Sequence, residues 1–217
     1  MSRRLAREIV ETMRRMNAVG LNQGTSGNLG VRWRNRILIT PTGVPYDELT
    51  PAMIVRMAPD GSFAGDWAPS SEWRIHAGLL GHRPEVGAVL HAHSPYATAL
   101  ACLDRGIPAF HYMVAKAGGA DIRCAPYATF GSAALAAAAA RALDGRLACL
   151  LANHGMLALG ATPKAALALA IEVETLAAQY WRALQLGVPN LLSAAEMERV
   201  LNKFKSYGRQ PARKTAR

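Results

Sequence analysis

Three histidines are the residues of this chain best suited to do chemistry. His91 and His93 stand one residue apart at the end of an apolar run typical of a buried strand, and residues i and i+2 of a strand project to the same side. His154 follows a second apolar run, residues 148–152. If the two strands are neighbours, three neutral imidazoles converge and leave one coordination position open, as in a catalytic divalent metal site, most often zinc. The spacing therefore predicts a three-histidine zinc site.

Three other histidines fit this site less well. His76 and His82 stand six residues apart in a predicted helix, which places them on different faces, and we expect both to face solvent or a partner. His111 lies in a mixed apolar segment without a matching neighbour. None of the three is predicted to bind the metal.

Several loops supply donors suited to an anion. Residues 24–28 offer backbone amides, hydroxyls and a carboxamide, Thr42-Gly43 adds a second turn, and Ser70-Ser71 stand at a predicted helix start. Glycine-rich loops and helix N-termini bind phosphate through their N–H groups. The glycine spacing matches neither the dinucleotide pattern G-x-G-x-x-G nor the phosphate-binding loop of nucleotide hydrolases, so nucleotide binding by those routes is not supported.

Glu72 is the candidate acid or base. It follows the two serines directly, where a carboxylate can complement the helix dipole or act as a general acid/base beside a metal. The spacing alone leaves both roles open. Lys116 and Lys164 have no activating neighbours in the sequence, which argues against a covalent lysine route.

Five motifs occur in a fixed order along the chain. They are Gly-Thr-Ser-Gly-Asn at 24–28, Thr-Pro-Thr-Gly at 40–43, Ser-Ser-Glu at 70–72, His-Ala-His at 91–93 and Asn-His-Gly at 153–155. This order resembles the class II aldolase/adducin family, and within it the L-fuculose-1-phosphate aldolases, over nearly the whole chain. Further matching segments are His-Tyr-Met at 111–113, Cys-Ala-Pro-Tyr-Ala-Thr-Phe-Gly at 124–131 and Lys-Phe-Lys-Ser-Tyr-Gly at 203–208. Asn153 stands where some aldolases have another histidine, a change that leaves the ligand His154 in place.

The resemblance implies a zinc-dependent aldolase, with Mn²⁺ or Co²⁺ as alternative ions. Such an enzyme cleaves a ketose 1-phosphate reversibly, through an enediolate, to dihydroxyacetone phosphate and a small aldehyde. L-Fuculose 1-phosphate, a 5-deoxypentulose 1-phosphate and 5-methylthioribulose 1-phosphate remain open as substrates. The family is typically a fourfold symmetric homotetramer with active sites between subunits.

The resemblance also implies a role for individual residues. Glu72 would move the proton at C3 of dihydroxyacetone phosphate, Tyr112 of a neighbouring subunit would donate a proton to the aldehyde oxygen, and Tyr207 would help to close the site. The metal would be held by His91, His93 and His154. The phosphate would be bound by Thr25, Gly27, Asn28, Thr42, Gly43, Ser70 and Ser71.

Three alternatives remain open at this stage. A pentulose-phosphate 4-epimerase would use the same scaffold, but such epimerases generally carry aspartate where Glu72 stands. A methylthioribulose-1-phosphate dehydratase is a second alternative on that scaffold. A non-catalytic adducin-like binding module is a third, and the intact histidine set together with Glu72 speaks against it.

Hydrophobic spacing and capping residues predict the elements that position these side chains. The predicted fold is a single α/β domain with a largely antiparallel central sheet flanked by helices, the three-layer arrangement of the family. Helices are expected at 2–19, 70–82, 94–104, 132–143, 162–186 and from 193 onward. Strands are expected at 31–33, 37–40, 54–57, 86–93, 122–125 and 148–152, with 156–159 as a continuation of the last.

Composition limits the partners of the protein. The 217 residues carry a formal net charge of +10, and residues 199–217 contribute seven Lys or Arg and no acid. We therefore expect residues 1–208 to form the aldolase domain, residues 209–217 a basic disordered tail, and no nucleic-acid surface.

No apolar run approaches the roughly 20 residues of a membrane span. The N-terminus lacks a secretion signal, and the three cysteines form no C-x-x-C pair, so a cytoplasmic location is expected.

Overall fold

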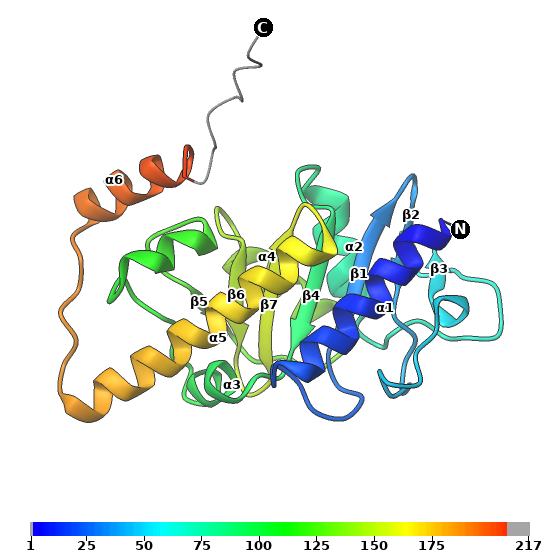
Figure 1. The fold of residues 1–217 in the computed structure, drawn as a ribbon, viewed down its shortest axis with the longest axis horizontal. Coiled ribbons are helices and arrows are strands. Elements are labelled where there is room, and N and C mark those ends of the chain that lie inside the picture. The colour runs from blue at the N-terminus through cyan, green and yellow to red at the C-terminus, as the bar shows by residue number, and fades with distance from the viewer. Residues whose placement is uncertain (1, 208–217) are drawn as a thin grey trace, which may run out of the picture.

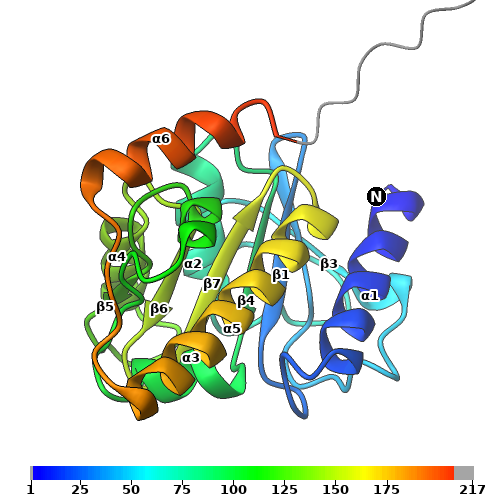
Figure 2. The same cartoon turned by 60° about the vertical axis from the view of Figure 1, so that its left-hand side comes forward.

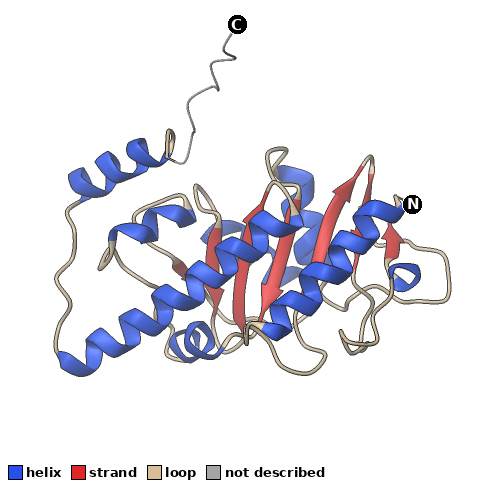
Figure 3. Ribbon diagram, viewed as in Figure 1, coloured by secondary structure: helices blue, strands red, loops and turns tan. Residues whose placement is uncertain are grey.

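A seven-stranded sheet runs through the centre of the protein, and helices cover both of its faces (Figures 1 and 3). The computed structural model describes residues 2–207. The strands lie in the spatial order β3-β2-β1-β4-β7-β6-β5, and every pairing is antiparallel except that of β5 with β6. Their bounds are β1 Asn28–Trp33, β2 Arg36–Ile39, β3 Val55–Met57, β4 Ala88–Ala92, β5 Arg123–Ala125, β6 Ala148–Leu151 and β7 Gly155–Gly160. The predicted α/β fold with a largely antiparallel sheet is confirmed.

The helices divide into two layers. α1, α3 and α5 cover one face of the sheet and share one hydrophobic core with it, whereas α2 and α4 pack against the opposite face over a second core (Figure 1). α6 packs against the 3₁₀ helix η2 beyond the edge of these layers (Figure 2). The bounds are α1 Arg3–Ala18, η1 Pro51–Met53, α2 Trp73–His82, α3 Pro95–Ala101, η2 Tyr112–Ala117, α4 Ala133–Ala142, α5 Pro163–Leu186 and α6 Ala194–Phe204.

The alternation of side chains along β4 places the histidines on the α2 side of the sheet. Ala88, Leu90 and Ala92 belong to the core beneath α5, and Val89 belongs to the core beneath α2. Because side chains alternate between faces, His91 lies on the same side as Val89. The sheet register then pairs Asn28 of β1 with His91, so Asn28 also projects toward α2.

Two details of the elements differ from the sequence prediction. α2 begins at Trp73 with Glu72 at its N-cap position, so neither Ser70 nor Ser71 caps it. Residues 155–160 do not continue β6: the chain reverses at Asn153, which has a φ of +53°, and β7 pairs antiparallel with β6. A short polar side chain tolerates this left-handed conformation better than a bulky one.

The prediction that His76 faces solvent or a partner is wrong. The His76 side chain is fully buried beneath α2 against the sheet, whereas His82 at the end of the same helix is exposed as expected. The error arose because a helical spacing argument compares residues of one helix and does not include the strand that the helix covers.

The predicted tail at 209–217 lies outside the described residues, as do Met1 and Gly208. Across residues 2–207, no helix combines the length and the low charge needed to cross a lipid bilayer.

Candidate active site

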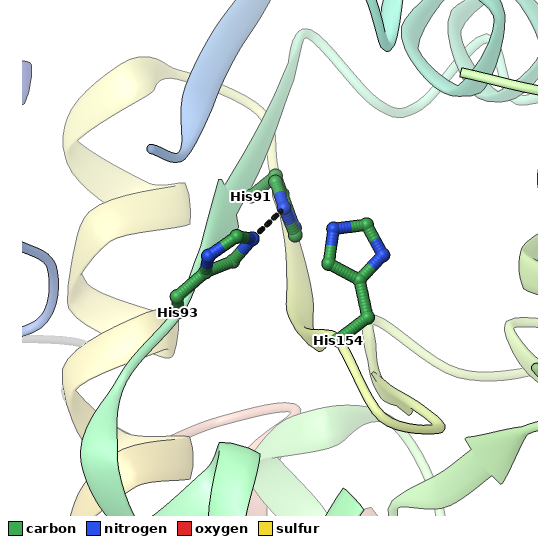
Figure 4. A group of neighbouring side chains, drawn as sticks. All are labelled: His91, His93 and His154. Carbon is green, nitrogen blue, oxygen red and sulfur yellow. Dashed lines mark hydrogen bonds between the residues drawn. The ribbon is translucent and has the colours of Figure 1, made fainter. Parts of the chain in front are cut away.

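Three imidazoles meet at the carboxyl end of β4, as the sequence predicts. His91 is in β4, His93 follows the last residue of that strand, and His154 is in the turn between β6 and β7 (Figure 4). Their ring centroids are 4.7 to 4.9 Å apart, and one nitrogen from each ring lies within 4.8 Å of the other two. The antiparallel pairing of β4 with β7 brings these distant segments together.

The imidazole of His91 is held neutral with a lone pair toward the cluster. Its Nδ1 lies 2.9 Å from the carbonyl oxygen of Met156, so Nδ1 carries the proton and Nε2 has a free lone pair. Burial lowers the pKa of His91 to about 4, and burial with the neighbouring His154 also lowers the pKa of His93. These two rings are therefore neutral at physiological pH, the form in which histidine binds metal ions.

The carboxylate of Glu72 lies against the same cluster. Its Oε2 is 3.2 Å from Nε2 of His91, and its Oε1 is 3.4 Å from Nε2 of His154. Asn28 donates a hydrogen bond from Nδ2 to Oε2 at 3.0 Å. Burial alone would raise the pKa of Glu72, but the adjacent histidines and the bond from Asn28 outweigh burial and lower it. Glu72 is therefore an ionised carboxylate that can accept a proton.

The donor set fits a divalent cation. Nε2 of His91 and Nε2 of His93 are only 2.9 Å apart. Burial favours the neutral form of both rings. Oε1 of Glu72 is buried and has no hydrogen-bond partner among the described residues. Buried polar atoms without partners are uncommon, and a cation among three neutral nitrogens beside a carboxylate would satisfy all of these groups.

A pocket of about 320 Å³ opens beside the histidines. His93, His154 and Glu72 line it, and so does every residue that the sequence analysis assigned to phosphate binding: Thr25, Gly27, Asn28, Thr42, Gly43, Ser70 and Ser71. Three loops separated in sequence thus present hydroxyl and amide donors to one cavity. The remaining lining includes Tyr127, Phe130 and Asn153.

Gly27 is the position in this lining where only glycine fits. Its φ is +78°, in the left-handed region, and a Cβ there would lie 2.9 Å from the carbonyl oxygen of His91. The loop can therefore approach the end of β4 closely. This brings its hydrogen-bond donors, which are suited to an anion, next to the histidines.

Sequence reasoning missed two residues that hold this loop, because neither belongs to a recognisable motif. Asn22 accepts a hydrogen bond from the backbone N–H of His93 at 3.0 Å and donates one to the carbonyl of Ser26. The hydroxyl of Tyr46 lies 2.5 Å from the carbonyl oxygen of Gly27. Burial, with the charge of Glu72 next, raises the pKa of Tyr46, so the hydroxyl stays protonated and donates.

We expect Tyr46→Phe to weaken phosphate binding without changing the metal site. The substitution removes one buried hydrogen bond to Gly27, which typically stabilises a protein by about 1 kcal/mol. The KM for a phosphorylated substrate should rise several-fold while zinc content stays at the wild-type value. Steady-state kinetics and elemental analysis check this, and an unchanged KM would contradict it.

The buried His76 predicts a pH dependence of stability. Burial lowers its pKa to about 4 in the folded protein, whereas an unfolded histidine has a pKa of about 6.5. Between these values the unfolded chain binds a proton that the folded chain does not, so stability falls as pH decreases, by up to about 1.4 kcal/mol per pH unit. Urea unfolding of the metal-stripped protein should show this fall, and a His76→Gln variant should show a shallower one. Equal slopes would contradict the prediction.

Tyr112 and Tyr207 do not reach the histidines of their own subunit's pocket. Both line a separate groove beside α6, where the rings of Tyr112 and Tyr207 each pack against Phe204. Their side chains are half or more exposed, at 50% and 76%. A role for either residue in the histidine pocket therefore requires a second subunit and stays a prediction.

Comparison with known sequences agrees with this geometry. Residues 7–181 match the family described as Class II Aldolase and Adducin N-terminal domain. The chain belongs to the class II aldolase and adducin family. The matched range contains all three histidines, Glu72 and the three loops of the pocket.

Individual members of this family are similar over nearly their full lengths. The chain is 56% identical over 200 residues to the 5-methylthioribulose-1-phosphate/5-deoxyribulose-1-phosphate aldolase of Rhodospirillum rubrum, spanning 92% of this chain and 90% of that protein. It is 48% identical over 206 residues to the L-fuculose phosphate aldolase of Escherichia coli K12, spanning 94% and 96%. A solved structure of an L-fuculose 1-phosphate aldolase has a TM-score of 0.91 at 41% identity and covers 94% of this chain and 98% of that one.

Proposed function

We propose that this chain is a metal-dependent class II aldolase, a lyase that cleaves a ketose 1-phosphate reversibly to dihydroxyacetone phosphate and a small aldehyde. One observation carries the proposal: three imidazoles, a buried carboxylate and three donor-rich loops meet at one pocket. A ketose 1-phosphate presents a phosphate at one end and neighbouring oxygens on the reacting carbons, and the pocket has complementary groups for both.

The proposed metal is zinc, held by His91, His93 and His154, with Mn²⁺ or Co²⁺ as alternatives. Three neutral nitrogen donors are a common ligand set of catalytic zinc. When bound, the ion supplies a Lewis acid that stabilises the negative charge left on the substrate oxygens as the carbon–carbon bond breaks. The Nδ1–H bond from His91 to the carbonyl of Met156 keeps that ring oriented toward the ion.

Glu72 is proposed to move the proton at C3 of dihydroxyacetone phosphate. Its carboxylate lies within 3.4 Å of two of the histidines, so a substrate held by the metal and the loops would present its reacting carbon nearby. The pKa of Glu72 lies below its ordinary value, which keeps the carboxylate in the form that accepts a proton. The phosphate loops fix the substrate against this base and thereby supply orientation.

The substrate is proposed to be a ketose 1-phosphate of five or six carbons. The similar proteins carry names that refer to L-fuculose phosphate, 5-methylthioribulose 1-phosphate and 5-deoxyribulose 1-phosphate. All of these share the phosphorylated end and differ in the aldehyde half. Tyr127, Phe130 and Asn153 line the pocket without belonging to the phosphate loops, and we propose that they contact the aldehyde half.

A homotetramer with sites between subunits is proposed to complete the pocket. Tyr112 and Tyr207 are exposed and line a groove separate from the histidine pocket of their own subunit. In a cyclic assembly this groove of one subunit can meet the pocket of the next, where Tyr112 would donate a proton to the aldehyde oxygen and Tyr207 would help to cover the site.

Subunit mixing tests this assembly. Glu72→Gln and Tyr112→Phe subunits, each of low activity alone, are expected to regain activity when they are unfolded together and refolded as mixed oligomers. The reason is that a site combining Glu72 of one subunit with Tyr112 of another is intact. If mixed oligomers form and activity stays at the level of the separate variants, Tyr112 does not act across the interface.

A cytoplasmic location is also proposed. Cys102, Cys124 and Cys149 are all free thiols in the structure. A chain whose cysteines form no disulfide is suited to a reducing compartment.

The experiment that tests the function is a product assay on a short panel of substrates. Zinc-loaded protein is incubated with L-fuculose 1-phosphate, 5-deoxyribulose 1-phosphate and 5-methylthioribulose 1-phosphate, and dihydroxyacetone phosphate is measured. We expect it to be released from at least one of the three. An epimerised sugar, a dehydrated ketone or no turnover with any of them would overturn the proposal.

A further inference from the structure

His76 is a buried histidine that the mechanism above does not use. Its side chain is fully buried in the middle of α2, one helical turn beyond Glu72. A buried imidazole loses its hydration, and that loss is unfavourable unless the ring makes a hydrogen bond in the fold. The partner of His76 therefore indicates what the residue is for.

A chain of hydrogen bonds links His76 to the proposed base. Nε2 of His76 lies 2.5 Å from Oδ1 of Asn28, and Nδ2 of Asn28 donates to Oε2 of Glu72 at 3.0 Å. A carboxylate can only accept, so the amide nitrogen of Asn28 must face Glu72 and the amide oxygen must face His76. It follows that Nε2 of His76 carries a proton and donates it to Asn28.

The sheet leaves a space that fits this ring. Gly30 lies two residues after Asn28 on β1, and a Cβ at Gly30 would lie 2.5 Å from Nδ1 of His76 and 2.7 Å from its Cγ. The ring thus packs directly on the backbone of β1. With the helix on one side and Gly30 on the other, the imidazole has little freedom to rotate away from Asn28.

We propose that His76 is a positioning residue that fixes the amide of Asn28 and, through it, aims the carboxylate of Glu72. The inference rests on the proposed function of Glu72 as the base. Both polar ends of the Asn28 side chain are occupied by this chain of bonds. Asn28 therefore orients the base in addition to lining the pocket, and only the second hydrogen of its amide nitrogen is free to contact a substrate.

A matched pair of variants tests the inference. His76→Leu removes the N–H donor, whereas His76→Gln keeps a donor near the position of Nε2. We expect kcat of the leucine variant to fall by about 10- to 100-fold, the range seen when an orienting partner is lost. KM and zinc content should stay near the wild-type values, and glutamine should restore most of kcat. A merely structural role would lower thermal stability in both variants without this split between kcat and KM.

Two outcomes would overturn the inference. One is a folded leucine variant with the kcat of wild type or of the glutamine variant. The other is a loss confined to KM or zinc content. Should the leucine variant fail to fold, Gly30→Ala crowds the ring from β1 and is expected to lower kcat in the same way, so an unchanged kcat in folded Gly30→Ala protein would count against the inference.

A spectroscopic readout is independent of activity. In protein labelled with ¹⁵N-histidine, His76 is expected to show the neutral tautomer protonated at Nε2, and a resonance protonated at Nδ1 would overturn the hydrogen-bond assignment. If the wild-type protein cleaves none of the ketose 1-phosphates, the proposed function fails while this tautomer can still be observed. If the wild-type protein is active and His76 is protonated at Nδ1, only the inference about His76 fails.

Discussion

Replacing Glu72 by glutamine is expected to lower kcat by at least about 100-fold, the usual contribution of a general acid/base. Glutamine has the size of glutamate and can still accept the hydrogen bond from Asn28, so the fold and the pocket should persist. It cannot carry a proton at physiological pH, so during cleavage it cannot deliver a proton to C3 of the departing dihydroxyacetone phosphate, and in the reverse direction the proton at C3 has no acceptor. Steady-state kinetics with a cleaved ketose 1-phosphate measure the loss.

The interpretation depends on the metal remaining in place. Elemental analysis should find the same zinc content in Glu72→Gln and wild-type protein. Glu85→Gln is the matched control, because Glu85 is an exposed carboxylate paired with Arg83 at a distance from the pocket lining. A Glu72→Gln variant with wild-type kcat would disprove the assigned role, and one that loses zinc along with activity would show a structural role at the metal.

Replacing His93 by alanine is expected to empty the metal site and abolish activity. The substitution removes one of three nitrogen donors, and the loss of zinc affinity should exceed the 10- to 100-fold that typically follows loss of a group that only hydrogen-bonds to a ligand. Elemental analysis after dialysis measures this directly. The fold should survive, since His93 follows the end of β4 and its side chain is partly exposed.

His82→Ala is the control for this experiment. His82 is an exposed histidine at the end of α2, with its ring against the carbonyl of Gly78, and it lies outside the cluster of three imidazoles. The His82→Ala protein should have the zinc content and the activity of the wild type. Full zinc occupancy in the His93→Ala protein would show that other residues hold the ion.

The cluster of three histidines could be predicted from the sequence because its geometry is largely local. The spacing of His91 and His93 on one strand fixes their common side, and only the adjacency of the second strand had to be assumed. The assumption that residues 148–152 lie next to β4 is wrong, because β7 lies between β4 and β6, and His154 reaches the cluster from the turn between β6 and β7. The three donor-rich loops of the pocket could be predicted in the same way, because glycine, serine and threonine at turns have a limited set of uses.

The residues that support the site could not be predicted in this way. His76, Asn22 and Tyr46 act through partners that are distant in sequence: Asn28 for the first, His93 for the second and Gly27 for the third. A histidine in a helix can face solvent or the core, and the glycine on β1 that accommodates His76 is visible only once α2 is placed on the sheet. Long-range packing decides such positions, and spacing along one chain does not encode it.

The most direct test of the central claim is a zinc titration of the metal-stripped protein, followed by release of dihydroxyacetone phosphate from a ketose 1-phosphate. If the three histidines hold the catalytic ion beside Glu72, activity should be absent at the start, rise linearly with added zinc and level off at one ion per subunit. Cleavage that proceeds in the stripped protein in the presence of a chelator, or a saturated protein that releases no product, would contradict the account.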